Sequence, residues 1–253
     1  MRRDVLDLRR FYASPLGRAV RDRVSRKLAE AWGDARGLDV LGVGYATPFL
    51  DGFRPQARRV VAAMPAQQGV EVWPADGRNL SCLAEEAALP FMNALFDRVL
   101  VTHGLEEAPD LIALLEEVKR VMAPSGRAIF AVASRAGLWA GAESTPFGYG
   151  RPFTRRQLEE VVREAGLEPA AWSRAVYIPP HPAFAPHAEL VEQLGSRVWP
   201  PFSGLILLEA VKQTFAVKPR AVRAPAFAPA ECCARPLRPP RPGETLCGGP
   251  CFH

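Results

Sequence analysis

The feature that most constrains this chain is a change of pattern at Leu38. From there to about residue 135, short apolar runs alternate with segments of helical periodicity. Apolar runs of this length are typical of buried strands, and strands that alternate with helices form parallel sheets. The sequence therefore predicts an α/β fold in which helices cover both faces of a sheet.

Seven strands are expected, and helices are expected ahead of them and between them. A helix should begin at Ser14-Pro15 and end before Gly33, and another should begin at the capping box formed by Thr154 and Gln157. Two more are expected at 110–122 and near 189–198, and Pro124-Ser125-Gly126 should turn the chain after the first of these. The expected strands are 38–43, 59–64, 79–84, 98–102, 128–133, 172–178 and 205–215.

Charge separates the two ends of the chain from its body. Residues 1–36 carry ten Lys or Arg against five Asp or Glu, and residues 217–253 carry six against two, whereas residues 37–216 are net negative. We expect an N-terminal amphipathic helical segment at 1–36, an α/β domain at 37–216 and a disordered tail rich in Pro, Arg and Cys at 217–253. Solubilising charge explains the basic ends most simply, so a nucleic-acid partner is not expected.

Location and metal content are also predicted from composition. The sequence has no run of 18 apolar residues and no apolar signal core, so we expect a cytoplasmic protein without a membrane-spanning helix. Cys82 should be a small buried side chain in a strand. The other four cysteines lie in the tail without a familiar zinc spacing, so no metal site is expected, although a protein partner of the tail stays open.

A glycine-rich turn follows the first strand directly, in the run Gly42-Val43-Gly44-Tyr45-Ala46. Such a turn lets backbone N–H groups approach a ligand, and a following helix adds positive potential. The same turn fits a nicotinamide-dependent dehydrogenase. That alternative is disfavoured because the third glycine position would be Thr47 and no acid follows the second strand.

The order of the motifs beyond the turn is more specific. Glu85-Glu86 precedes Leu89-Pro90-Phe91, and then come Phe96-Asp97 and Pro124-Ser125-Gly126. With this combination, residues 37 to about 135 resemble the class I S-adenosylmethionine-dependent methyltransferases, particularly their small-molecule branch. The resemblance implies a three-layer, Rossmann-like sheet of seven strands with an antiparallel last strand. It also implies S-adenosylmethionine as cofactor and a small-molecule methyl acceptor.

The resemblance further implies which residues surround the cofactor. The glycine turn would enclose its methionine portion, Glu85, Glu86 and Ala87 would lie beside the adenine, and His103 would belong to the floor after the fourth strand. His103 is also the candidate general base, with a purely structural role as the alternative. Tyr149 and Arg151 would form a lid over the acceptor or an ordinary surface loop. The cofactor-binding set is Gly42, Val43, Gly44, Tyr45, Ala46, Met64, Pro65, Glu85, Glu86, Ala87 and His103.

Two positions depart from the family pattern. The acid expected two residues before the first glycine is Val40, and Asp39 is displaced by one residue, which in a strand points to the opposite face. The acid expected after the second strand, which would bind the ribose hydroxyls, is Met64, with Gln67 or Gln68 as replacements. The alternative function is therefore a methyltransferase fold that has lost catalysis and serves as a binding or scaffolding protein.

Overall fold

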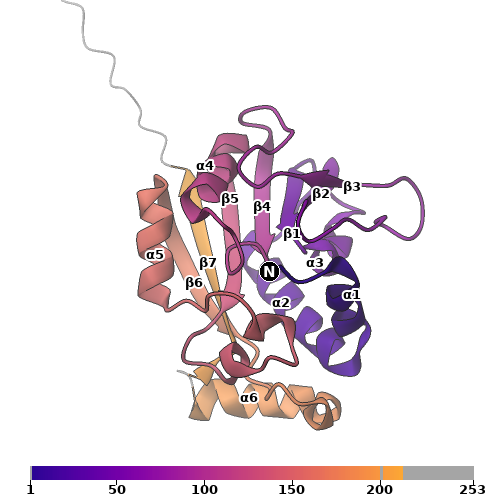
Figure 1. Cartoon of the computed structure of the whole chain (residues 1–253), viewed down its shortest axis with the longest axis vertical. Coiled ribbons are helices and arrows are strands. Elements are labelled where there is room, and N and C mark those ends of the chain that lie inside the picture. The colour runs from indigo at the N-terminus through magenta and orange to yellow at the C-terminus, as the bar shows by residue number, and fades with distance from the viewer. Residues whose placement is uncertain (1, 200–201, 213–253) are drawn as a thin grey trace, which may run out of the picture. The chain divides into compact units, whose positions relative to one another are not determined.

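The computed structural model describes residues 2–199 and 202–212. Their strands form one sheet in the order β3-β2-β1-β4-β5-β7-β6 (Figure 1). All seven expected strands are present, and the predicted α/β fold is confirmed. The strands are β1 (Asp39–Gly44), β2 (Arg59–Pro65), β3 (Ser81–Ala84), β4 (Phe96–Thr102), β5 (Met122–Ala133), β6 (Leu167–Ala175) and β7 (Leu205–Lys212).

The direction of the strands places a reversal in the middle of the sheet. Strands β3, β2, β1, β4 and β5 are parallel, whereas β7 is antiparallel to both of its neighbours. The chain winds from β1 outward to β3 and then returns to the other side of β1 for β4 and β5. Ligands of such sheets bind outside the carboxyl ends of the strands at this reversal. The topology therefore directs attention to the carboxyl ends of β1 and β4.

Helices cover both faces of the sheet and complete the three predicted layers. Val40, Ala62 and Leu100 pack on the face that meets α1, α2 and α3, whereas Val43 and Val101 pack on the face that meets α4 and α5. Each cluster is almost fully buried. The helices are α1 (Val5–Ala13), α2 (Pro15–Trp32), α3 (Thr47–Leu50), α4 (Leu111–Val121), α5 (Arg155–Glu164) and α6 (Ala188–Val198). In the described part of the chain, no helix is long and apolar enough to cross a membrane.

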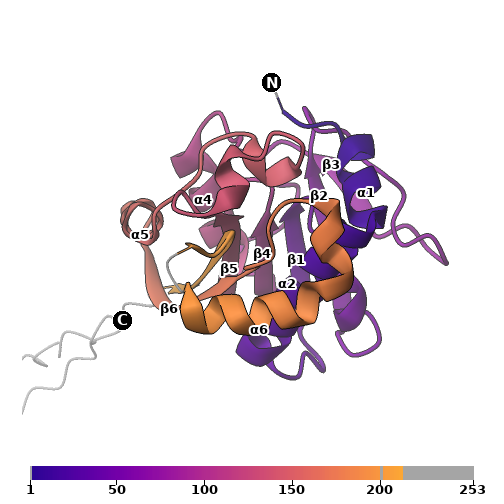
Figure 2. The same ribbon diagram turned by 90° about the horizontal axis from the view of Figure 1, so that it is seen from below.

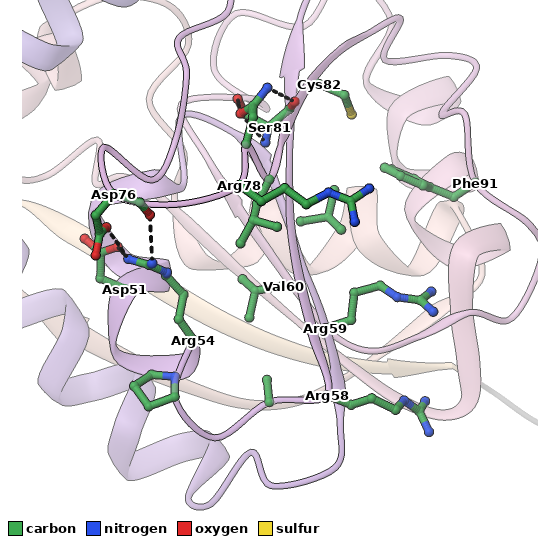
Figure 3. A pocket seen from close by; sticks show the side chains of 15 residues that line it. Asp51, Arg54, Arg58, Arg59, Val60, Asp76, Arg78, Ser81, Cys82 and Phe91 are labelled. Atoms are coloured by element: carbon green, nitrogen blue, oxygen red, sulfur yellow. Dashed lines mark hydrogen bonds and ion pairs between the residues drawn. The ribbon is translucent and has the colours of Figure 1, made fainter.

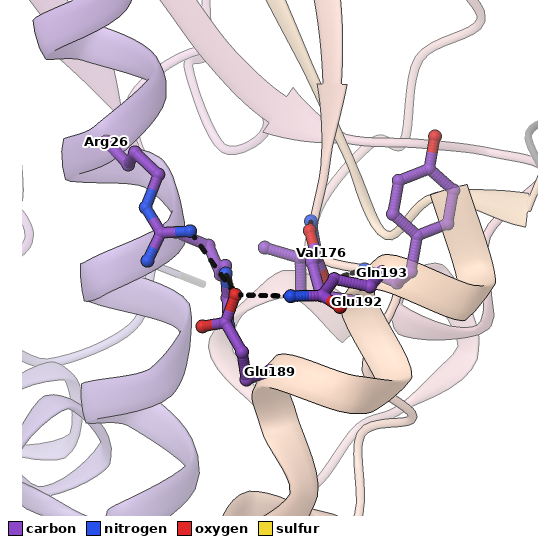
Figure 4. A network of polar contacts seen from close by, with 7 residues as sticks. Arg26, Val176, Glu189, Glu192 and Gln193 are labelled. Atoms are coloured by element: carbon purple, nitrogen blue, oxygen red, sulfur yellow. Dashed lines mark hydrogen bonds and ion pairs between the residues drawn. The ribbon is translucent and has the colours of Figure 1, made fainter. Parts of the chain in front are cut away.

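Polar contacts hold α6 beside α2, as Figures 2 and 4 show. Glu189 accepts hydrogen bonds of 2.5 and 3.2 Å from the guanidinium of Arg23 and one of 3.2 Å from Gln193. Glu192 accepts hydrogen bonds of 2.9 and 2.7 Å from the backbone N–H groups of Val176 and Tyr177. Because these two backbone groups follow β6, α6 is fixed both to α2 and to the end of that strand.

Helices with local end signals form where the sequence predicts them. Ser14 caps α2 by accepting a hydrogen bond from the N–H of Gly17, and the helix ends at Gly33. Thr154 and Gln157 form the complete capping box of α5. Helix α1 lies within the helical segment expected at 1–36, but its own bounds were not predicted, because its nine residues bury only three side chains (Val5, Leu8 and Tyr12).

The predicted turn at Pro124-Ser125-Gly126 is wrong, because β5 begins at Met122 directly after α4. Phe96 of β4 pairs with Met122, and Arg98 pairs with Arg127, so β5 advances five residues while β4 advances two. A bulge in β5 absorbs this excess. A Cβ atom on Gly126 would lie 2.9 Å from the carbonyl oxygen of Ala123, which explains why the bulge contains glycine.

No helix connects β2 to β3 or β3 to β4. A groove of about 900 Å³ lies on this side of the sheet, at the amino ends of β2 and β3 (Figure 3). Cys82 lines it and is only partly buried, contrary to the expectation of a fully buried side chain. Two of the arginines that line the groove already have carboxylate partners, since Arg58 binds Asp39 and Arg54 pairs with Asp76. The remaining arginines are exposed, and the groove is at the opposite end of these strands from the topological reversal.

Candidate functional site

The glycine turn joins the carboxyl ends of β1 and β4. Gly44 has a φ of +84°, and a Cβ atom there would lie 2.1 Å from the carbonyl oxygen of Thr102. Only glycine fits such a position without strain. The N–H of Tyr45 donates to the Thr102 carbonyl at 2.9 Å, and the Thr102 hydroxyl donates to the Tyr45 carbonyl at 2.9 Å. The turn is thereby fixed at the topological reversal, and residues 42–46 are all buried.

His103 follows β4 on the floor of the same site. Its φ is +51°, a conformation that few residues other than glycine adopt and that clusters at functional sites. The side chain is buried, and this burial lowers the pKa of the imidazole to about 3, so His103 is neutral at pH 7. A hydrogen bond of 2.7 Å joins its Nε2 atom to the hydroxyl of Tyr12. Burial also raises the pKa of Tyr12 well above its ordinary value, so the hydroxyl keeps its proton.

An acidic side chain at the end of β3 binds a buried arginine. Arg2 places two guanidinium nitrogens 2.7 Å from the two carboxylate oxygens of Glu86. The Nη2 atom of Arg2 also donates to the carbonyl of Gly104 at 2.8 Å, and its side chain is only 2% exposed. Bidentate, charge-assisted hydrogen bonds of this kind are among the stronger hydrogen bonds in proteins. Arg2 therefore ties the end of β3 to the loop after β4.

Glu106 is a second buried acid beside this loop. Its Oε1 atom accepts a hydrogen bond of 3.2 Å from the N–H of Ala133, whereas Oε2 has no partner among the described residues. Burial raises the pKa of the Glu106 carboxyl to about 7. Helix α4 begins only at Leu111, so Glu106 is not at a helix start, and its buried carboxyl lies beside Ala133, the last residue of β5.

The end of β2 carries no acid, as the sequence indicated. Met64 and Pro65 are buried, and Asp39 binds Arg58 at the amino end of β1, far from the site along the strand. Gln68 is 1% exposed, and both atoms of its side-chain amide lack a hydrogen-bond partner in the described part of the chain. An unpaired buried amide costs about 1–3 kcal/mol. Gln68 is thus an unsatisfied polar group close to the position expected to bind the ribose.

The space that is left at this edge is small. A pocket of about 100 Å³ remains between Arg2, the end of β2 and the turn after β3, whereas ligand pockets usually measure about 300–1,000 Å³. The ring of Tyr12 stacks on that of Tyr45, a residue of the glycine turn, with the ring centroids 5.8 Å apart. Glu85 and Ala87 are exposed at the rim, whereas the rest of the predicted set is partly or fully buried. The residues as they stand do not leave room for S-adenosylmethionine, the cofactor expected from the resemblance.

The insertion at residues 136–151 packs over the same edge. Trp139 is buried and donates from its indole N–H to the carbonyl of Ile178 at 2.7 Å. The guanidinium of Arg3 lies 3.8 Å above the ring of Tyr149, and Arg151 donates to the carbonyl of Ala108 at 2.5 Å. Tyr149 and Arg151, expected as a lid or a surface loop, are thus bound to the N-terminus and to the loop after β4.

Four residues that contribute to the site were not predicted, namely Arg2, Tyr12, Trp139 and Phe147. Each acts across a long separation in sequence, so no local pattern marks it. No group of three potential metal ligands occurs among residues 2–199 and 202–212. The four tail cysteines considered for metal binding lie outside the described residues.

Comparison with known proteins identifies the family. The family model described as a methyltransferase domain matches residues 12–171. No curated protein sequence matches the chain.

Three solved structures share the fold. A structure from Haloferax volcanii, of a methyltransferase in complex with the Trm112 activator, has 20% identity and a TM-score of 0.55, covering 77% of this chain and 98% of that one. A methyltransferase from Thermotoga maritima has 16% identity and a TM-score of 0.55, with coverage of 83% and 96%. The cyclase SpnF has 22% identity and a TM-score of 0.53, with coverage of 76% and 80%.

Identities at this level show a shared fold. The presence of a cyclase among these structures agrees with the rule that one fold can host different reactions. The strand order and the antiparallel β7 agree with the fold expected from the resemblance. The family match favours a methyltransferase over the nicotinamide-dependent dehydrogenase that the glycine turn alone left open. The chain belongs to the methyltransferase domain family, with the class I sheet.

Proposed function

We propose that this protein transfers a methyl group from S-adenosylmethionine to a small-molecule acceptor. The observation that carries the proposal is the meeting of three predicted elements at the topological reversal: the glycine turn after β1, Glu86 after β3 and His103 after β4. Membership of the methyltransferase family supports the same conclusion.

In this proposal, the protein mainly binds and orients its ligands. Holding two reactants in line and excluding water supplies much of the acceleration of a displacement reaction. The backbone of residues 42–46 and the carboxylate of Glu86 would hold the cofactor, and Gln68 would find hydrogen-bond partners that it now lacks.

A base is needed only when the acceptor loses a proton. His103 is the candidate because it lies on the floor of the site, although burial lowers its pKa to about 3 and so makes it a weak base while the site is closed. In the structure, its Nε2 atom is already bonded to the hydroxyl of Tyr12. His103 can therefore act as a base through Nε2 only after Tyr12 has moved away.

The cytoplasmic location, the domain boundaries at residues 36 and 216, and a protein partner for the tail remain proposals from the sequence. The complex of the Haloferax volcanii methyltransferase with an activator supports looking for such a partner.

The proposed activity is tested by incubating the full chain with S-adenosylmethionine and pools of small amines, phenols and carboxylic acids. The measured quantity is S-adenosylhomocysteine, which forms only when a methyl group leaves the cofactor. We expect its formation to depend on one class of acceptor. If the protein binds S-adenosylmethionine but forms none with any pool, the proposed small-molecule activity is contradicted.

A scaffolding protein is the second candidate function. Met64 in place of the ribose acid favours it, as does the small size of the remaining pocket. Such a protein would bind neither S-adenosylmethionine nor S-adenosylhomocysteine.

A further inference from the structure

The N-terminal strap, which comprises residues 2–13, lies on the carboxyl edge of the sheet. It consists of the extended residues 2–4 and of α1, which Figures 1 and 2 show on the side of β2 and β3. Arg2 binds Glu86 and Gly104, as described above. The N–H of Val5 donates to the carbonyl of Gln68 at 2.9 Å. The contacts of the strap therefore fall on the residues around which the cofactor site is proposed.

We propose that this strap is an autoinhibitory gate, so that docking of the strap and binding of the cofactor exclude each other. The proposal rests on the proposed function and names the regulation of that same site. It resolves the conflict between the expected cofactor and a pocket of about 100 Å³.

The polar half of the gate is Arg2. Its guanidinium satisfies both carboxylate oxygens of Glu86 and the carbonyl of Gly104, and it is almost fully buried. Any ligand that donates hydrogen bonds to these acceptors competes directly with Arg2. The same groups therefore close the site when Arg2 is present and accept from a ligand when Arg2 has left.

The aromatic half of the gate is Tyr12. Its hydroxyl binds Nε2 of His103, and its ring stacks on that of Tyr45 in the glycine turn. The neighbouring Phe11 packs edge-on against Trp139 and Phe147, with ring centroids 6.2 Å away in both cases. The insertion at 136–151 thus holds the strap from the outer side, and closure blocks both the cofactor position and the candidate base.

Movement of the strap has to break its contacts with α2 as well as those at the site, since Phe11 lies against Gly17 and the Ser14 hydroxyl donates to the Phe11 carbonyl at 2.6 Å. Ser14 has extended backbone between α1 and α2, and its own hydroxyl caps α2. A change of backbone angles at Ser14 moves α1 relative to α2, and it breaks the hydrogen bond between the Ser14 hydroxyl and the carbonyl of Phe11. Hinges of this kind are a few residues at the ends of elements.

The gate has a measurable consequence for affinity. The apparent dissociation constant of a ligand equals its intrinsic constant divided by the fraction of open protein. A gate that is open in about 1% of the molecules weakens binding about 100-fold. Loss of the Arg2 contacts, or of the hydrogen bond from Tyr12 to His103, is expected to recover about 10-fold or more of this factor.

The test uses the full chain with Arg2→Ala or with Tyr12→Phe, which removes only the hydroxyl. The matched control is Arg10→Ala, which makes the same charge change in the strap at a side chain that is 77% exposed and pairs with Asp7. Calorimetry measures the affinity for S-adenosylhomocysteine, and hydrogen exchange measures the protection of residues 2–13. Urea unfolding confirms that each variant is folded.

We expect Arg2→Ala and Tyr12→Phe to bind S-adenosylhomocysteine about 10-fold or more tightly than the wild type, and to exchange the strap amides faster. Arg10→Ala should match the wild type in both measurements. Adding the ligand to the wild type should accelerate exchange in the strap.

Two results would overturn the gate, and they differ in what they say about function. Measurable but equal affinity in the wild type and both gate variants refutes the gate alone. Absence of binding of S-adenosylmethionine and S-adenosylhomocysteine to all of these proteins, with the strap exchanging faster in the variants, refutes the proposed function and the gate with it.

Discussion

Replacing Glu106 by Gln should change how the stability of this protein depends on pH. Burial raises the pKa of the carboxyl to about 7 from its ordinary value of 4.5. At about 1.4 kcal/mol per pH unit, this difference corresponds to about 3 kcal/mol of unfolding free energy. One of the two carboxylate oxygens has no partner among the described residues, which agrees with a charge that the folded protein tolerates poorly.

The sign follows from proton binding. Between pH 4.5 and 7, the unfolded carboxyl has lost its proton while the folded one still holds it, so the unfolded state binds fewer protons. The protonated Glu106 carboxyl therefore makes its full contribution to the free energy of unfolding below pH 4.5. This contribution falls as the pH rises from 4.5 to 7, and it stays at its lower value above pH 7. Glu106→Gln has no ionisable group at this position and escapes the loss.

The assay is urea unfolding of the wild type and Glu106→Gln at pH 5 and pH 8. The free energy of unfolding of the variant relative to the wild type should rise by about 2–3 kcal/mol between these two conditions. Glu116→Gln, the same change at an exposed position of α4, is the control. A constant difference for Glu106→Gln would refute the assignment of a buried, destabilising carboxylate.

Three further predictions concern single side chains. The imidazole NMR signals of His103 should not shift between pH 5 and 8, because burial holds its pKa near 3, and titration near pH 6 would contradict its buried placement. Gly44→Ala should lower the free energy of unfolding by at least about 2 kcal/mol, because its Cβ meets the Thr102 carbonyl. The control Gly52→Ala has nothing within 4 Å of its Cβ and should unfold at nearly the wild-type urea concentration. Thr154→Ala should cost about 1 kcal/mol through loss of the capping box, a cost that denaturation curves measure; an unchanged midpoint would show that the cap contributes little.

The parts of the fold that the sequence predicted are those with signals inside one segment. Ser14 and Gly33 bracket α2, and Thr154 begins α5. The bulge in β5 was missed because Pro124-Ser125-Gly126 is also a good turn sequence, and pairing with β4 decides between the two structures. The bounds of α1 within the expected helical segment at 1–36 were missed, because only three of its side chains are buried and they leave a weak apolar pattern.

The candidate site divides in the same way. The family resemblance implied that the motifs after β1, β3 and β4 surround one site, and the structure brings the glycine turn, Glu86 and His103 to the same edge of the sheet. Its closure was not predictable, since Arg2 and Glu86 are 84 residues apart in sequence. The depth at which Glu106 is buried also depends on tertiary packing alone.

The central claim is that the edge where β1 and β4 meet binds S-adenosylmethionine. The most direct test is calorimetric titration of the purified full chain with S-adenosylmethionine and S-adenosylhomocysteine, with NADH run alongside. The account predicts that both sulfur ligands bind, with affinities reduced by the closed strap, and that NADH does not. No binding of either sulfur ligand, in the wild type or in Arg2→Ala, would contradict the account and favour the scaffolding protein.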